Sequence, residues 1–180
     1  SGLLNLKQFG APIRPVQPDG IWKKVGGTAY QYEVSPGSER HRRGIYVVLK
    51  RGSPYPSFTN FDATARLTCT VKRSRTNTPL QALTLLNDPV YVEAARSLAN
   101  RVTTEKKGES LDDQLDYAFQ LCTARRPTDA EREILKNLFS QQLEATKERT
   151  ADSTRPKAEL EAWYSVASIL LNMHETIMKD

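Results

Sequence analysis

Apolar residues recur every three or four positions from about residue 78 to the end of the chain, which is the spacing of one face of an α-helix. Five such series follow one another, so five helices are predicted in this part of the chain. The inward positions of the second to fifth helices are Val92, Ala95, Leu98, Ala99, Val102; Leu115, Ala118, Phe119, Cys122; Ile134, Leu135, Leu138, Leu143; and Leu160, Trp163, Ala167, Leu170, Leu171, His174. Helices with one apolar face bury it against each other, and the pattern therefore predicts a helical bundle.

The starts of these helices are marked by residues that bond to the unpaired N–H groups of a first turn. Thr78 and Gln81 form a capping box with Pro79 at the first helical position, and Asp88–Pro89 repeats the cap-plus-proline pattern. The remaining starts are predicted at Ser110, at the Thr128–Glu131 capping box and after Pro156. The first helix is therefore expected to end near Asn87, where the second one begins.

The N-terminal part of the chain has a different pattern. Residues 1–29 are rich in proline and glycine, which predicts an extended arm pinned by Trp22 in an apolar crevice. Alternating Tyr30, Tyr32 and Val34, then a turn signal and a β-branched run, predict a β-hairpin of about 30–35 against 43–50. An isolated hairpin is only marginally stable in water, so this one is expected to lie on the helices.

The predicted fold class is mainly α: a helical bundle of about five helices with a small N-terminal β-hairpin and an extended Pro/Gly-rich arm. A chain of 180 residues is long enough for one well-formed core, so residues 1–180 are expected to form a single domain. Within it, 1–77 would form the arm plus the basic β-hairpin, and 78–180 the helical part. No apolar run approaches the roughly 18 residues of a membrane helix, so no membrane span is predicted.

Charge is distributed unevenly along the chain. Residues 1–80 hold 13 Lys and Arg against 4 Asp and Glu, a balance of +9, whereas 81–180 hold 13 against 17, a balance of −4. The basic half is where a polyanionic partner would bind. The alternative is that the basic half pairs with the acidic half or with a neighbouring domain.

One candidate anion-binding site lies where a basic run meets a helix start. The helix predicted at Pro79 begins with unpaired N–H groups that attract phosphate, sulfate or carboxylate, and arginine suits these groups as a bidentate donor. The residues expected to form this site are Lys72, Arg73, Arg75, Thr76, Asn77, Thr78, Arg42 and Arg43, with Arg40, Lys50 and Arg51 as an extension. The alternative is structural: Asp62, Asp88 and Glu93 would pair with the arginines, and Asn77 and Thr78 would serve as caps.

The residue pattern gives little support to catalysis or metal binding. No nucleophile elbow, zinc-protease motif, phosphate-binding loop or dinucleotide fingerprint is present, so no catalytic residue is assigned. A carboxylate pair such as Asp62 with Asp88 or Glu93 is the remaining acid/base option. Cys69 and Cys122 form no C-x-x-C pair, leaving one disulfide or two free thiols, and two isolated histidines predict no zinc site.

Several motifs resemble those of a known family. The stretch FDATARLTCTVKRSRTNTPLQALTLLNDPVYVEAARSLANRV, from residue 61, resembles the signature of the planctomycete cytochrome-c-associated C-terminal domain, catalogued as domain of unknown function fifteen fifty-three. Upstream RHRRGIYVVLKRGSPYPSFTNFDA, from residue 40, and downstream CTARRPTDAE and AWYSVASILLNMHE, from residues 122 and 162, are similar to further motifs of that family.

The resemblance implies a setting rather than a reaction. Such domains sit near the C-terminal end of long exported proteins, behind a haem-bearing module, so residues 1–180 would be the C-terminal portion of a larger domain. It implies a periplasmic or secreted location, other domains of the same protein as partners, and no cofactor in this chain, which has no haem motif.

Pattern and resemblance together favour an uncharacterised, non-catalytic structural or binding module of a larger exported protein, with anionic polysaccharide as its ligand. One alternative is part of a polysaccharide-degrading enzyme whose site is completed by residues outside this chain. Another is a nucleic-acid-binding domain, because Tyr30, Tyr32 and Tyr46 are interleaved with the basic residues.

Overall fold

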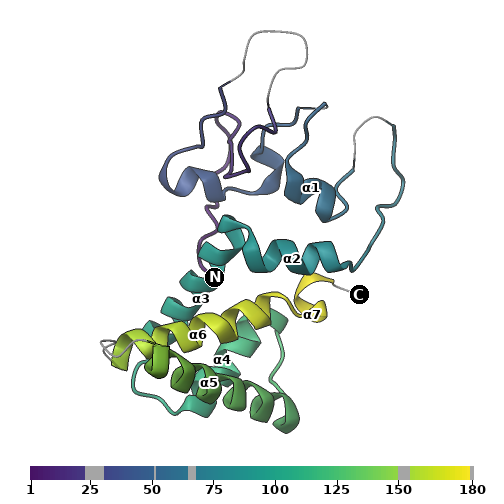
Figure 1. Ribbon diagram of the computed structural model, residues 1–180. Helices are drawn as coiled ribbons and strands as arrows, with labels where there is room; N and C mark the ends of the chain where they lie inside the picture. Colours follow the sequence, from purple (N-terminus) through teal and green to yellow (C-terminus); the bar gives the residue numbers. More distant parts are fainter. Residues whose placement is uncertain (23–30, 51, 65–67, 150–154, 179–180) are drawn as a thin grey trace. The chain divides into compact units, whose positions relative to one another are not determined.

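A computed structural model describes residues 1–22, 31–50, 52–64, 68–149 and 155–178 of the chain (Figure 1). Within these residues the chain is mainly helical, with seven α-helices and two short 3-10 helices. It divides into two compact units: the N-terminal unit, Leu3–Thr84, and the helical unit, Ser1–Gly2 with Leu85–Asp180. The basic excess of the sequence belongs to the first unit and the acidic excess to the second. That the units form a single domain stays a prediction.

The helical unit contains α3 (Pro89–Glu105), α4 (Leu111–Thr123), α5 (Asp129–Arg149), α6 (Arg155–Leu171) and α7 (His174–Ile177). Helix α6 packs against both α3 and α5, and α4 contacts α3, α5 and α6 (Figure 1). The short α7 packs against α4 and α6. The predicted helical bundle is thus confirmed.

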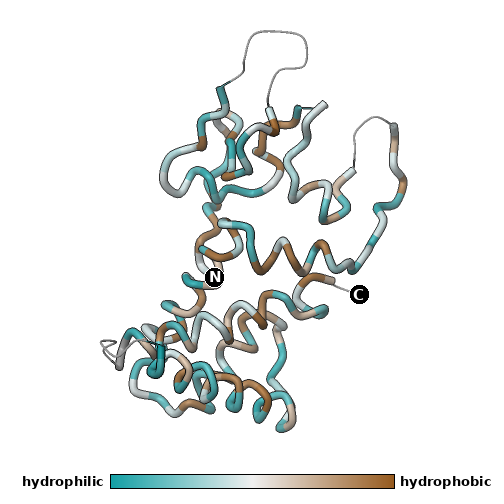
Figure 2. Tube along the Cα trace, in the orientation of Figure 1, coloured by the Kyte–Doolittle hydropathy of each residue, from teal (hydrophilic) through white to brown (hydrophobic). Residues whose placement is uncertain are grey.

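The core of the helical unit is formed by the predicted apolar faces. Its buried members are Ala95, Leu98, Ala99, Val102, Leu115, Ala118, Phe119, Leu135, Phe139, Ala162, Trp163, Val166, Ala167 and Leu170. Figure 2 shows hydrophobic and hydrophilic residues alternating within the turns of these helices, as amphipathic helices require. The prediction of an inward position was wrong for two residues. Ile134 is 67% exposed. His174 is exposed because α6 ends at Leu171 and a new turn begins at His174.

The predicted helix starts at Pro79, Asp88–Pro89, Ser110 and Thr128 are confirmed with their caps, whereas α6 begins at Arg155, just before Pro156. The Asp88 carboxylate accepts a hydrogen bond from the Val90 N–H at 2.9 Å, and the Ser110 hydroxyl accepts one from the Asp113 N–H at 3.2 Å. Helix α2 (Pro79–Asn87) begins behind Thr78, and α5 begins behind Thr128. Side chains that satisfy first-turn N–H groups are local signals, which explains why sequence alone locates these starts.

The predicted β-hairpin of 30–35 against 43–50 is wrong. Residues 37–41 and 44–46 form the 3-10 helices η1 (Gly37–His41) and η2 (Gly44–Tyr46), and Tyr30 lies outside the described residues. Both expected strands bond to the N-terminal arm instead of to each other. The N–H groups of Ser35 and Val48 donate to the carbonyls of Arg14 and Ile13, each at 2.9 Å.

Parallel bridges between the arm and the 42–47 segment replace the hairpin. They pair Asn5 with Arg42 and Ile13 with Val47. Ile13 is buried, and so is Trp22, whose indole N–H donates to the Ser53 carbonyl at 3.2 Å. The sequence pattern predicted that the two segments would pair with each other as a hairpin. In the structure both segments pair with the extended arm, because long-range pairing overrides local strand propensity.

An arginine network closes one end of the helical unit. The Arg125 guanidinium donates to both carboxylate oxygens of Glu131, at 2.7 and 2.9 Å, and to both of Glu175, at 2.8 and 2.9 Å. Glu131 also accepts the Thr128 N–H at 2.7 Å, as the predicted capping box requires. The network joins the α4–α5 connection to α7, so the Arg-Arg-Pro-Thr motif has a structural role.

This network makes stability depend on pH in the acid range. Hydrogen bonds from the Arg125 guanidinium, and then from the Thr128 N–H, lower the pKa of Glu131 from 4.5 to about 2. A carboxylate with a lowered folded-state pKa contributes stability above the unfolded pKa, and that contribution is lost as pH falls from 4.5 towards 2. We expect Glu131→Gln to lower Tm by about 2–4 °C at pH 6, equivalent to about 1 kcal/mol for a partly exposed network, and by little near pH 2.

Thermal unfolding followed by circular dichroism across this pH range measures the difference. Glu133→Gln, an exposed change on the same helix, is the matched control and is expected to leave Tm unchanged. If the difference in Tm between Glu131→Gln and the unchanged chain stays constant from pH 6 to pH 2, the assigned ion pair is contradicted.

Candidate functional site

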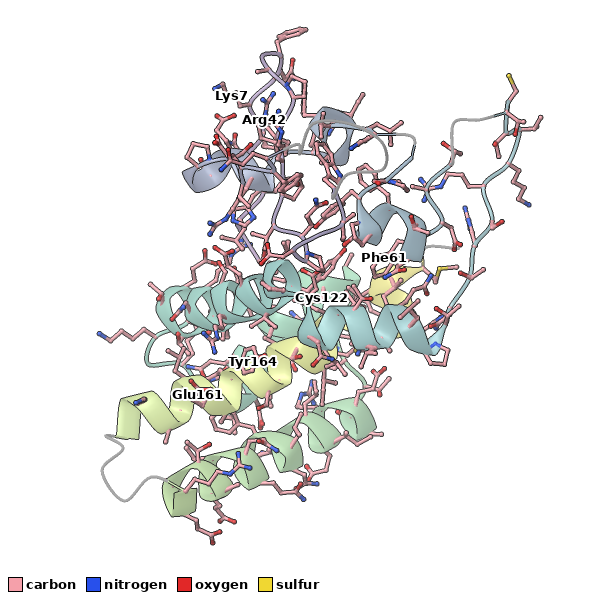
Figure 3. The ribbon with its side chains drawn as sticks, turned by 45° about the horizontal axis from the view of Figure 1, so that its top comes forward. Lys7, Arg42, Phe61, Cys122, Glu161 and Tyr164 are labelled. Atoms are coloured by element: carbon pink, nitrogen blue, oxygen red, sulfur yellow. The ribbon has the colours of Figure 1, made fainter. Side chains whose placement is uncertain are left out.

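A cavity of about 850 Å³ opens within the N-terminal unit. Three segments line it: the start of η2 and the chain after it, helix α1 (Pro56–Asn60) with its flanks, and the basic run before α2. The apolar residues of the lining are Ile45, Leu49, Pro54, Phe58, Phe61 and Ala63, together with Gly44. The hydroxyl-bearing residues are Thr59, Thr64, Thr70 and Ser74. The charged residues are Asp62, Lys72 and Arg73. Figure 3 shows Phe61 beside the end of α1. The cavity thus combines an apolar wall with hydroxyl groups and two cations.

The two cations of the cavity are held differently. Arg73 donates from Nε to the Asp62 carbonyl at 3.1 Å and from Nη2 to the Phe61 carbonyl at 3.4 Å, which fixes its guanidinium against the turn after α1. Arginine has five N–H donors, so the Nη1 group remains available to a ligand. The Lys72 side chain is exposed, and its ammonium pairs with no carboxylate among the described residues.

The turn at Asp62 is built by a polar network. Asp62 has a φ of 57°, and its Oδ2 accepts hydrogen bonds from the Thr76 N–H at 2.8 Å and the Thr76 hydroxyl at 2.7 Å. The Gln81 side chain, 1% exposed, donates to the Asn60 carbonyl at 2.8 Å and to the Thr76 hydroxyl oxygen at 3.1 Å. Thr76 therefore connects the Asp62 turn to α2, and its polar groups are used internally.

The start of α2 is closed by its own capping box. The Thr78 hydroxyl accepts the Gln81 N–H at 3.2 Å, and the Gln81 side-chain oxygen accepts the Thr78 N–H at 3.1 Å. Arg75 and Asn77 are exposed and do not line the cavity. Of the six predicted site residues from 72 to 78, the structure brings Lys72 and Arg73 to the cavity and uses Thr76 and Thr78 in its support. Gln81 was expected only as a cap, and no sequence signal indicated its burial.

Arg42 lies in a different environment from the one predicted. Its side chain is 1% exposed and donates to the carbonyls of Lys7 at 3.1 Å, Ala11 at 3.4 Å and Phe9. It also pairs with Glu39 at 3.4 Å and stacks over the Tyr46 ring at 3.9 Å. Figure 3 shows Arg42 close to Lys7 of the arm. Arg42 therefore clamps the arm and does not line the cavity.

The other predicted cations are distributed around the unit. Arg43 is exposed and directly precedes Gly44, which lines the cavity. The Arg40 guanidinium donates to the His41 ring at 3.1 Å. Lys50 is exposed, with its ammonium 5.0 Å from the centre of the Trp22 ring, and Arg51 lies outside the described residues. Arg40, Arg43 and Lys50 are not among the described residues of the cavity lining.

The described residues offer few groups for metal binding, thiol chemistry or acid/base catalysis. Among the described residues, no three His, Cys, Asp or Glu side chains gather as a metal site would require. Cys69 and Cys122 are free thiols, and burial raises the pKa of Cys122. Asp88 caps α3, and burial raises its pKa. No helix in the described part of the chain has the length and apolar content needed to cross a membrane.

Comparison with models of protein families identifies a match. The family model described as "Protein of unknown function (DUF1553)" matches residues 1–139, which include the whole cavity lining and the helices α1 to α4. No curated protein and no solved structure matches the chain.

Proposed function

Because the chain belongs to the DUF1553 family of proteins of unknown function, we propose a function from its own cavity: the N-terminal unit is a non-catalytic module that binds anionic polysaccharide. The observation that carries this proposal is a cavity of about 850 Å³ with Lys72 and Arg73 in its wall. Cavities of roughly 300–1,000 Å³ are the size in which proteins hold small ligands.

Electrostatics supports an anionic ligand. The segment that forms the N-terminal unit carries the +9 balance of residues 1–80, so its field attracts anions before contact. Within the cavity, Lys72 offers three N–H donors and Arg73 its Nη1 group. An anion placed between them would receive charge-assisted hydrogen bonds, which are stronger than neutral ones.

The rest of the lining suits a sugar. A pyranose ring has apolar C–H faces and a rim of hydroxyl groups. Phe58 and Phe61 offer apolar surface, while Thr59 and Ser74 offer hydroxyl groups that both donate and accept. Ligand sites in general combine an apolar lining with a few polar groups that fix orientation.

The carboxylates among the described lining residues support binding without turnover. Glycoside hydrolysis ordinarily uses two carboxyl groups on opposite sides of the scissile bond. Asp62 is the one carboxylate among the described lining residues, and its Oδ2 is occupied by two hydrogen bonds from Thr76. From the resemblance of its motifs, we further propose that the module belongs to a larger exported protein of the planctomycete cytochrome-c-associated type, with other domains of the same protein as its partners.

Isothermal titration calorimetry of the chain with anionic oligosaccharides tests the proposal. Lys72→Gln is expected to weaken binding about five- to tenfold, because it removes one charge-assisted contact worth about 1 kcal/mol or slightly more. Raising the salt concentration is expected to weaken binding of the unchanged chain.

Lys107→Gln is the matched control, since it removes the same charge from an exposed position of the helical unit. Equal losses from Lys72→Gln and Lys107→Gln would indicate that net charge alone attracts the ligand. Release of cleaved product by the unchanged chain would overturn the non-catalytic role.

A further inference from the structure

We infer that the cavity selects a uronic-acid sugar, with one carboxylate on each residue, over a densely sulfated one. The inference rests on the proposed function and names the ligand class within it. Three features of the same cavity carry it: the balance of charges in its lining, the number of donor groups that its cations have to offer, and the neutral hydroxyl groups around them.

The charge balance of the lining fits one negative charge. Lys72 and Arg73 are its cations and Asp62 its carboxylate among the described residues, a net balance of +1. A sugar residue with several sulfate groups would bring surplus negative charge next to Asp62. Like charges repel one another in a partly exposed site, and water and salt reduce this repulsion without removing it. A single carboxylate leaves no such surplus.

The available donors also match one carboxylate. Arg73 uses Nε and Nη2 on the carbonyls of Asp62 and Phe61, at 3.1 and 3.4 Å, and Nη1 is its remaining donor group. The Lys72 ammonium is the second available group. One oxygen of a carboxylate can accept from each of these two groups. The second and third sulfate groups of a dense pattern would find no further cation in the described lining.

The hydroxyl-bearing residues of the lining also favour a uronic-acid sugar over a densely sulfated one. Thr59, Thr64, Thr70 and Ser74 line the cavity with neutral groups that can both donate and accept. Free sugar hydroxyls pair with such groups, whereas sulfation converts those hydroxyls into bulky anions. The lining therefore recognises a sugar whose hydroxyl groups are intact and whose charge is a carboxylate.

The test is calorimetric titration of the full 180-residue chain with four probes of matched length. The probes are an oligouronate, its carboxyl-reduced neutral form, a sulfated oligosaccharide and a single-stranded DNA oligonucleotide. At about 0.15 M salt, where distant charges are screened, the oligouronate is expected to bind at least tenfold more tightly than each of the others.

A variant tests the reason for the selectivity. Asp62→Asn removes the negative charge of the lining, while an amide oxygen can still accept the hydrogen bonds from Thr76 and asparagine tolerates the positive φ of 57° at this position. The variant is expected to bind the sulfated probe at least threefold more tightly than the unchanged chain does. Asp113→Asn, an exposed change in the helical unit, is the control.

The possible failures are distinguishable. If the sulfated probe binds as tightly as the oligouronate or more tightly, the uronate inference is overturned while the anionic-polysaccharide module stands. If neither anionic oligosaccharide binds, or DNA binds most tightly, both proposals fail. An unchanged affinity of Asp62→Asn for the sulfated probe would overturn the charge balance as the cause of selectivity.

Discussion

Replacing Arg42 by alanine is expected to lower the free energy of unfolding of the N-terminal unit by about 2–4 kcal/mol, because it removes several hydrogen bonds of one buried, charged side chain. The carbonyls of Lys7, Phe9 and Ala11 would lose their donor, and the Glu39 carboxylate would lose a cation 3.4 Å away. The guanidinium itself is buried, whereas Lys7, Phe9 and Ala11 are exposed residues whose carbonyls water can partly reach, so the total stays below the sum of the separate bonds.

The loss of stability in Arg42→Ala is expected to be confined to the arm. Hydrogen exchange followed by mass spectrometry is expected to show faster exchange at residues 5–13 in Arg42→Ala, with the helical unit unaffected. Arg42→Lys should restore little, because one ammonium cannot replace a planar guanidinium that reaches three carbonyls and stacks on Tyr46. Arg43→Ala, the exposed neighbour, is the control and is expected to change stability by less than about 0.5 kcal/mol. Equal effects of the two alanine variants would refute the clamp.

The second large effect is expected for Gln81→Leu, at about 2–3 kcal/mol of unfolding free energy. Leucine has a similar volume but no polar atoms. The Asn60 carbonyl, the Thr76 hydroxyl and the Thr78 N–H would each lose a bond that now measures 2.8, 3.1 and 3.1 Å. Since Gln81 is 1% exposed, water cannot readily replace these bonds.

Urea unfolding gives the measurement for this variant. Gln120→Leu makes the same chemical change at an exposed position of α4 and should leave the unfolding midpoint almost unchanged. Because Gln81 supports the Asp62 turn behind Arg73, binding of an anionic oligosaccharide is also expected to weaken in Gln81→Leu. A midpoint within error of the Gln120→Leu value would show that the buried amide contributes no net stability.

Sequence reasoning succeeded where the physical signals are local. Capping at Thr78, Asp88, Ser110 and Thr128 involves atoms two or three residues apart, so spacing alone identifies it. Apolar periodicity likewise located the core of the helical unit, with Ile134 as an exception on the exposed side of its helix.

Sequence reasoning failed where hydrogen-bond partners are far apart in the sequence. Ser35 and Val48 each bond to an arm residue more than twenty positions away, and no period-two pattern could reveal that they do not pair with each other. Arg42 and Arg43 are identical side chains in adjacent positions, yet one is buried and the other exposed. Of the candidate site, sequence supplied Lys72 and Arg73 but not the apolar wall, because Ile45 and Phe58 come from segments whose contact depends on the whole unit.

The clamp formed by Arg42 also sets an order of events during synthesis. A ribosome delivers residues 5–13 well before Arg42, and it delivers Val47, the bridge partner of Ile13, later still. Until those residues emerge, the arm has no donor for its carbonyls and no strand to pair with. The first part of the unit to be made is thus among the last to become ordered, and a nascent chain stalled before residue 42 would carry the arm as an open substrate for proteases and chaperones.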